Sequence, residues 1–402
     1  MLTSLSLVFI VGLSMASICQ KVKIPRIIGM LITGIILGPF ALDFLSPSIL
    51  GISAELRRMA LIIILIKAGL ALDVTDLKKV GLPAILMSFL PALFEIAAFV
   101  LFAPAILSIT RLEAAIIGAV LGAVSPAVVV PKMVQLMETR YGTKKRIPQM
   151  ILAGASLDDV FVIVLFSTFV GMEQGGKVSL MDFINVPVSI ILGILLGAAT
   201  GFLIAWFWNR EYERNHKIRN SKKTIIILGL AFLLMAIEKW LENRIAVSGL
   251  LAVMSMACLI QIKSTETVTR RLSEKFGKLW IAAEVILFVL VGAAVDIRYT
   301  LQAGSSAVLL IFISLAFRSL GVLLSITGTD LNLREKIFCV IAYIPKATVQ
   351  AAIGSIPLSL GLPCGKLVLS VAVLSILITA PLGAFGMDLT YRRFLERESD
   401  SN

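Results

Sequence analysis

The chain is built from long apolar runs that alternate with short polar segments. A helix needs about 20 apolar residues to cross the hydrocarbon core of a bilayer, and only helices or closed barrels satisfy their backbone there. Runs of this length recur about 13 times, which predicts an all-α polytopic membrane protein with about 13 transmembrane helices. The expected spans are residues 2–18, 25–42, 58–72, 80–103, 111–136, 148–171, 184–208, 223–241, 246–262, 278–297, 304–327, 334–358 and 366–388.

The composition agrees with a membrane protein and argues against several other classes. Hydrophobic residues make up 58% of the chain and charged residues 15%, against about 25% charged residues in soluble domains. The net charge of +12 comes without a basic stripe interleaved with aromatic residues, so no nucleic-acid partner is expected. The single histidine, His216, excludes a His-built metal site. Because no nucleophile–base pair stands out either, we expect neither a cofactor nor an enzyme activity.

The distribution of Lys and Arg among the loops predicts the orientation in the membrane. Of the 37 Lys and Arg residues, 26 lie in the odd-numbered loops and the C-terminal tail, and 8 lie in the even-numbered loops. Cytoplasmic loops are enriched in Lys and Arg, so the N-terminus is expected outside and the C-terminus in the cytoplasm. We therefore expect a multi-pass protein of the cell (inner) membrane, embedded in the lipid bilayer.

An internal repeat relates the two halves of the chain. The third span ends in Gly-Leu-Ala-Leu-Asp73, and the tenth ends in Gly-Ala-Ala-Val-Asp296. The fifth and twelfth spans both contain a proline-marked interruption. Pairing spans that are seven apart gives two six-helix units that run in opposite directions. Inverted repeats with broken helices are typical of secondary transporters, whose substrate site lies near the bilayer midplane.

Three prolines predict where the two helices are interrupted. Pro126 and Pro131 enclose a β-branched stretch in the fifth span, and Pro345 precedes Lys346 in the twelfth. Each proline removes a backbone donor and disfavours a continuous helix. A proline kink is the simpler alternative. Interruptions at matched positions of the repeat favour discontinuous helices that cross beside a cavity.

Two adjacent acids, Asp158 and Asp159, lie within the sixth span. A carboxylate at this depth is costly unless it faces water, a cation or a partner, and each neighbouring acid resists ionisation of the other. The alternative to a transport role is a structural pairing with Lys346, which is placed to donate to either acid or to the carbonyl ends of the broken helix. One lysine matches only one acid. The pair therefore favours a site for protons, cations or both.

Two further charges lie at equivalent positions of the repeat, Glu95 in the fourth span and Arg318 in the eleventh. An ion pair between them is the economical way to bury both. Its role is either purely structural or part of ion handling. Glu284 and Lys67 are further charges within spans, and the sequence leaves open whether they face the lipid edge or form another pair.

Three motifs carry a family resemblance: Ala-Ser-Leu-Asp158-Asp159-Val, Gly-Ala-Val-Ser125-Pro126-Ala-Val-Val-Val-Pro131 and Ile-Pro345-Lys346-Ala-Thr-Val-Gln-Ala-Ala. They resemble the monovalent cation/proton antiporter superfamily, and within it the NHA-type sodium/proton antiporters. The resemblance covers essentially the whole chain and implies the sodium/proton antiporter fold. It also implies that Asp159 carries the cation and the proton, and that Asp158 associates with Lys346.

The resemblance further implies a homodimer and a division into domains. Dimerisation-domain helices are expected at residues 1–57, and the first half of a moving core domain at 58–171. A linker helix and more dimerisation-domain helices are expected at 172–277. The second half of the core is expected at 278–388, followed by a cytoplasmic tail at 389–402.

The predicted function is exchange of Na⁺ or Li⁺ for H⁺ by alternating access. These hard cations suit carboxylate, hydroxyl and carbonyl oxygens, so Asp159 and Asp158 are the expected ligands, with Ser125 and Ser156 as possible additions. Exchange of K⁺ for H⁺ and a monovalent cation channel remain alternatives, as does transport of an organic anion. No cofactor is expected beyond the transported Na⁺ or Li⁺ and H⁺.

Overall fold

The computed structural model describes all residues except 23, 72–80, 176–179, 216–219, 242–246 and 399–402, and His216 therefore lies outside it. The chain forms two compact units. The first comprises Met1–Ala54, Asp73–Glu173 and Leu287–Asn402, and the second comprises Glu55–Leu72 and Gln174–Ile286. These units are defined by how the residues pack. The predicted dimerisation and core domains are defined instead by how they move relative to each other, and that division stays a prediction.

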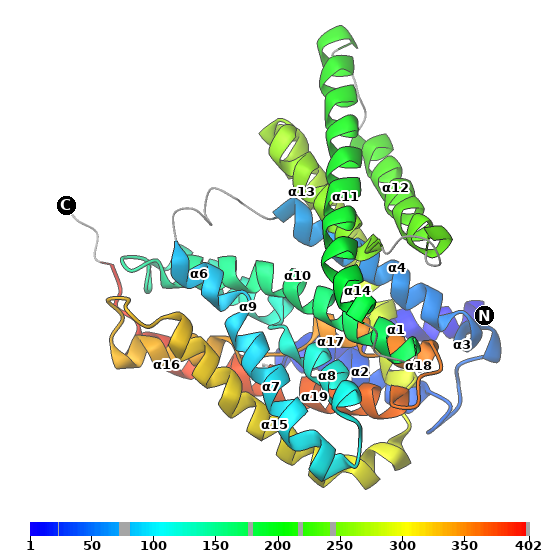
Figure 1. Cartoon of the computed structure of the whole chain (residues 1–402), viewed down its shortest axis with the longest axis vertical. Coiled ribbons are helices and arrows are strands. Elements are labelled where there is room, and N and C mark those ends of the chain that lie inside the picture. Colours follow the sequence, from blue (N-terminus) through cyan, green and yellow to red (C-terminus); the bar gives the residue numbers. More distant parts are fainter. Residues whose placement is uncertain (23, 72–80, 176–179, 216–219, 242–246, 399–402) are drawn as a thin grey trace. The chain divides into compact units, whose positions relative to one another are not determined.

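Helices account for nearly all of the described structure (Figure 1). The helices that lie wholly or mainly in the first unit are α1 (Leu2–Lys21), α2 (Arg26–Leu37), α3 (Pro47–Gly51), α6 (Leu82–Met87), α7 (Leu90–Leu107), α8 (Arg111–Gly122), α9 (Pro126–Glu138), α10 (Ile147–Gln174), α15 (Ile297–Ser325), α16 (Leu333–Ala342), α17 (Thr348–Ile353), α18 (Ile356–Ser359) and α19 (Gly365–Phe394). Those of the second unit are α4 (Ser53–Ala71), α11 (Leu180–Asn215), α12 (Asn220–Leu241), α13 (Gly249–Lys263) and α14 (Glu266–Ala293).

Every expected span coincides with a helix or a pair of helices, so the all-α polytopic class is confirmed. Within the described residues, nine helical segments are long and apolar enough to cross a bilayer, and α2 and α13 are shorter apolar helices. The remaining expected spans fall on α4 and on the pair α16–α17. The largest difference in a boundary is at α14, which begins at Glu266, well before the expected residue 278, because its Arg, Leu, Glu and Lys residues are good helix formers despite their charge.

Capping residues explain where α8 and α16 begin. Both helices lead to the site described below. At the start of α8, Glu113 N donates to Thr110 Oγ1 at 3.1 Å and Thr110 N donates to Glu113 Oε2 at 2.8 Å. At the start of α16, Asn332 and Glu335 exchange the same pair of bonds at 3.0 and 2.8 Å. Each reciprocal pair satisfies two backbone donors that a helix leaves open at its start.

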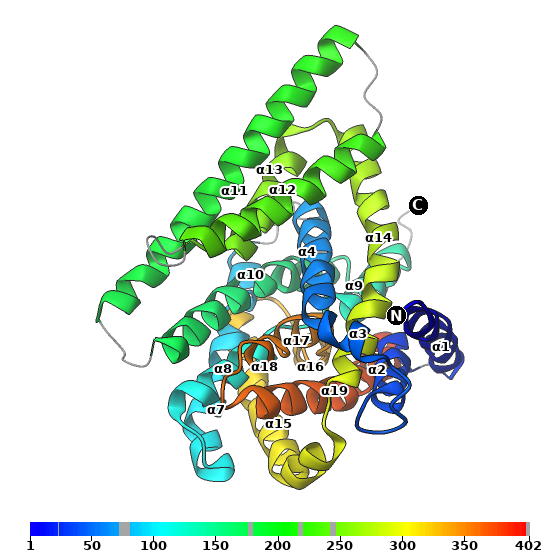
Figure 2. The same cartoon turned by 90° about the vertical axis from the view of Figure 1, so that its right-hand side faces the viewer.

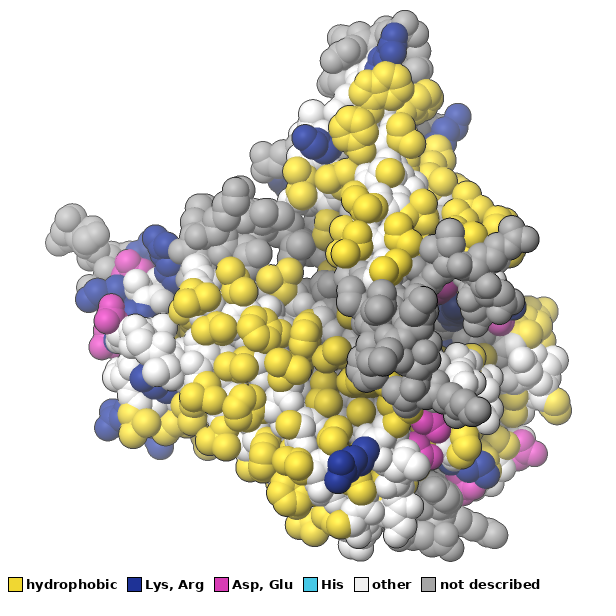
Figure 3. Space-filling view, in the orientation of Figure 1, with side chains coloured by type: hydrophobic (Ala, Val, Ile, Leu, Met, Phe, Trp, Pro, Cys, Tyr) yellow, Lys and Arg dark blue, Asp and Glu magenta, His cyan; other side chains and the backbone are white. Residues whose placement is uncertain are grey.

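Hydrophobic side chains cover much of the face shown in Figure 3. In the first unit, α7 and α15 pack side by side (Figure 1) and expose large apolar side chains such as Leu101 and Phe312. A soluble protein rarely exposes apolar surface on this scale. The first unit therefore has an outer surface suited to lipid.

In the second unit, α11 and α13 approach closely along a row of glycines (Figure 1 and Figure 2). Gly193, Gly197 and Gly201 recur every four residues on α11 and face the backbone of α13. A Cβ at Gly193 would lie 2.6 Å from Ser248 O, and one at Gly201 would lie 2.6 Å from Met256 O. Small residues at this spacing let helix backbones approach within the membrane.

We predict that Gly197→Ala weakens this helix pair, because the new methyl group would overlap the carbonyl of Ala252. The expected loss is about 1–3 kcal/mol of unfolding free energy, typical of overpacked sites. Gly229→Ala on α12 is the matched control, since a Cβ there meets no atom of another described segment within 4 Å. Thermal unfolding of the purified variants measures both, and an equal effect of the two substitutions would contradict the prediction.

Candidate functional site

Two interrupted helices meet in the first unit. Helix α8 ends at Gly122 and α9 begins at Pro126, while α16 ends at Ala342 and α17 begins at Thr348. Ser125 N donates to Pro345 O at 2.8 Å, so the two unwound stretches are hydrogen-bonded to each other. The predicted interruptions at Pro126 and Pro345 are confirmed.

Pro131 does not interrupt its helix, and that prediction was wrong. It lies inside α9, which continues to Glu138. The unwound stretch is confined to the residues before Pro126, with Ser125 in an extended conformation (φ −86°, ψ 111°). A proline removes one backbone donor, which a helix accommodates by bending. By contrast, Pro126 occupies the first position of α9, where its missing N–H costs nothing.

Arg318 lies between the two interruptions and is 1% exposed. Its Nε donates to Tyr343 O at 2.7 Å, and its Nη1 donates to Gly122 O, so it serves the last turns of both α8 and α16. Nη1 also donates to Glu95 Oε2 at 2.7 Å. The C-terminal end of a helix carries partial negative charge, which a guanidinium offsets. The expected pair of Glu95 and Arg318 is therefore present, and Arg318 has further partners besides.

Lys346 contacts Glu95 rather than Asp158. Its Nζ donates to Glu95 Oε2 at 2.8 Å and to Leu121 O, and the side chain is 0% exposed. Asp158 instead receives Arg318 Nη2, at 3.3 Å. The predicted pairing of Lys346 with Asp158 is thus not found in the described structure. The longer, forked guanidinium reaches both carboxylates, which leaves the single ammonium to share Glu95.

The aspartate pair lies on α10, and its two members have different surroundings. Asp158 is 0% exposed, and its Oδ2 accepts from Val124 N at 2.7 Å, in the first unwound stretch. Asp159 is 6% exposed and makes no ion pair with any described residue. The Oδ1 atoms of both acids are buried and have no hydrogen-bond partner among the described residues. Among the described acids at the crossing of the two interrupted helices, Asp159 alone has no cationic partner.

Buried hydroxyl groups add oxygen atoms near the interruptions. Ser125 Oγ, at the start of α9, has no hydrogen-bond partner in the described structure, as expected for a possible ligand. The side chain of Ser156, the other proposed ligand, lies outside the described residues. Thr348, Gln350 and Thr379 were not predicted, although all three are buried and polar. In the sequence, each could have been noticed only as an uncharged polar residue within an apolar run.

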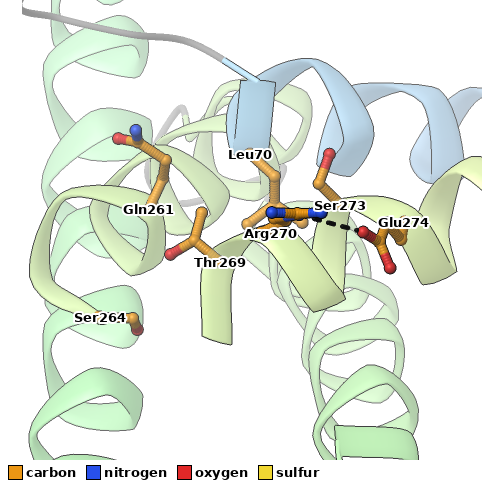
Figure 4. Close-up of a pocket in the computed structure, with 7 residues that line it drawn as sticks. All are labelled: Leu70, Gln261, Ser264, Thr269, Arg270, Ser273 and Glu274. Carbon is orange, nitrogen blue, oxygen red and sulfur yellow. Dashed lines mark hydrogen bonds and ion pairs between the residues drawn. The ribbon is translucent and has the colours of Figure 1, made fainter. Parts of the chain in front are cut away.

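A pocket of about 440 Å³ lies in the second unit (Figure 4). It is lined by residues of α4, α13 and α14 and by Ser264, and Arg270 Nε pairs there with Glu274 Oε1 at 3.3 Å. Lys67 and Glu284 are the two charges whose surroundings the sequence left open. Lys67 Nζ lies 5.9 Å from the centroid of the Trp280 ring. Glu284 is buried in the same unit. The pocket contains none of the predicted site residues.

A model of the family described as "Sodium/hydrogen exchanger, transmembrane" matches residues 5–388. The chain belongs to this family. Human sodium/hydrogen exchanger 9B2 is 34% identical over 359 residues, covering 87% of this chain and 66% of the human protein. The mouse exchanger of the same name is 32% identical, covering 86% and 63% of the two chains. The chain thus spans slightly less than two thirds of the length of these exchangers.

The exchanger fold is confirmed by a solved structure. The sodium proton antiporter MjNhaP1 from Methanocaldococcus jannaschii matches with a TM-score of 0.83 and covers 97% of both chains. At 21% sequence identity, this likeness establishes the fold alone. The predicted antiporter fold, with inverted repeats and crossed discontinuous helices, is therefore present in this exchanger-family chain.

Proposed function

We propose that this chain is a secondary active transporter that exchanges Na⁺ or Li⁺ for H⁺ by alternating access. The proposal rests on the surroundings of Asp159. This acid is buried beside two interrupted helices and has no ion-pair partner among the described residues. A carboxylate in this position is neutralised by a proton or by a cation, and the two compete. Competition for one site, together with access that alternates between the two sides of the membrane, is sufficient for exchange.

The neighbouring residues support this assignment. Asp158 is fixed by Val124 N and Arg318, so Asp159 is the member of the pair free to change partners. Oxygen ligands suit a hard monovalent cation, and the unpartnered Oδ1 atoms and Ser125 Oγ supply them. Ser156 stays in the proposal as a further ligand. The proton and the cation are cargo, and we propose neither a resident cofactor nor an enzyme activity.

The same proposal covers the surroundings of the protein. The chain is a multi-pass membrane protein. We assign it to the cell (inner) membrane as a homodimer, with the N-terminus outside and the C-terminus in the cytoplasm. A core domain at residues 58–171 and 278–388 would move against the dimerisation domain.

Flux in proteoliposomes tests the function. With an acidic lumen and a pH-sensitive dye, external Na⁺ or Li⁺ should raise the internal pH, and protein-free vesicles should give no response. A matching K⁺ response would favour the K⁺/H⁺ alternative. To separate an exchanger from a channel, an outward proton gradient should accumulate ²²Na⁺ above its external concentration, which no channel could do without a driving voltage. Failure of every alkali cation to move protons would contradict the proposal.

A further inference from the structure

Three consecutive carbonyl groups at the first interruption receive side-chain donors. Leu121 O and Gly122 O accept from the two buried cations of the site. The next carbonyl, Ala123 O, accepts from Gln350 Nε2 at 2.8 Å. Buried backbone carbonyls that lack a helical partner need such donors. Gln350 supplies the only one of the three that carries no charge.

The other end of the same amide serves the second interruption. Gln350 Oε1 accepts from Ala347 N at 2.7 Å, immediately before α17. One side chain thus bonds to a carbonyl of the first unwound stretch and to an N–H of the second. Gln350 is 0% exposed, and α17 packs against α8 and α19. Only a group with both a donor and an acceptor can make this link, and an amide does so without adding charge.

The link bears directly on the aspartate pair. Ala123 precedes Val124, whose N–H holds Asp158. Fixing the Ala123 carbonyl therefore fixes the peptide plane from which Val124 N points at Asp158, because the peptide group is planar. Loss of the amide would leave Ala123 O and Ala347 N buried and unpaired, and the two stretches would shift to find other partners.

We propose that Gln350 is a positioning residue that holds the two unwound stretches in the register required for cation binding at Asp159. The inference rests on the proposed function, since cation binding is what the register serves. It concerns affinity: the chain still folds and still exchanges without the amide, but it holds the cation less tightly.

Gln350→Leu tests this by separating KM from maximal rate in proteoliposomes. KM for Na⁺ should rise about tenfold, a factor equivalent to about 1.4 kcal/mol, while the maximal rate changes less than about twofold. Gln149→Leu is the matched control, since this half-buried glutamine of α10 has a side-chain oxygen with no hydrogen-bond partner in the described structure. An unchanged KM in Gln350→Leu would overturn the inference, whereas a wild-type chain without Na⁺-driven flux would overturn the proposed function itself.

Gln350→Glu adds a readout that a purely structural role would not produce. A protonated carboxyl group accepts from Ala347 N and donates to Ala123 O, whereas an ionised one cannot donate. The ratio of variant to wild-type KM should therefore fall toward one as pH is lowered, and the ratio for Gln350→Leu should stay flat. A ratio for the Glu variant that stayed flat and well above one would overturn the inference even if the Leu variant failed to fold. Other charged groups also face the crossing: Glu95, Asp158, Asp159, Arg318 and Lys346. Because they are present in the variant and in the wild type, dividing the variant KM by the wild-type KM corrects for their titration.

Discussion

Asp159→Asn is expected to abolish Na⁺-dependent proton flux, with a loss of at least about 100-fold, the scale expected when a group that transfers a proton is removed. The amide cannot release a proton in the accessible pH range and offers a cation no full negative charge. Because Asp159 has no ion-pair partner among the described residues, its replacement leaves no other charge unmatched. The variant should therefore fold normally, and the loss should be one of function.

Two aspartate substitutions frame this experiment. Asp330→Asn, at an exposed position, should leave the flux unchanged. Asp158→Asn keeps an oxygen that can accept from Val124 N, so part of the exchange should remain. Flux measured by dye response in proteoliposomes, with equal amounts of incorporated protein, compares all three. Retained exchange in Asp159→Asn would show that another group carries the proton.

Arg318→Gln is expected to destabilise the fold by about 3–5 kcal/mol, the usual cost of leaving a buried charge without its partner. Asp158 would then lose its cationic partner, Glu95 would keep only Lys346, and the carbonyl groups of Gly122 and Tyr343 would lose their donor. Thermal unfolding and recovery of monodisperse protein after extraction measure the effect. Arg334→Gln, at an exposed position, is the control.

A double variant tests whether charge balance is the cause. Two acids and two cations form the ion pairs at the crossing. Glu95→Gln combined with Arg318→Gln removes one of each and leaves the acid Asp158 and the cation Lys346. The double variant should consequently be more stable than Arg318→Gln alone, although it has lost more native groups. The comparison also needs Glu95→Gln alone. If the losses of stability in the two single variants simply added in the double variant, the hydrogen bonds to the carbonyl groups, rather than the charges, would account for the effect.

The sequence predicted the spans, the two interruptions and the pair of Glu95 and Arg318, because each depends on a local cost that lipid imposes. A charge or a proline within an apolar run is conspicuous wherever it folds. The partner of Lys346 was not predictable in the same way. Three acids on two different helices competed for it, and the outcome depended on the reach of Arg318 from a third helix.

Pro131 and Gln350 show two further limits of the sequence. Pro131 carries the same local signal as Pro126, and only the position of the helix start distinguishes a first-turn proline from an internal one. Gln350 carries a weak signal, because an uncharged amide in an apolar run is far less costly than an acid. Its importance depends on two backbone groups that come together only when the interrupted helices cross.

The ion pairs at the crossing have an electrical consequence. Glu95 and Asp158 balance Arg318 and Lys346, so the paired groups together carry no net charge when all are ionised. Asp159 alone leaves the assembly one electron charge negative, and a single proton or a single Na⁺ cancels that charge. The site loaded with either would cross the membrane field as a neutral body, and the transmembrane voltage would do no work on it. The energy for such an exchange would come from concentration differences alone.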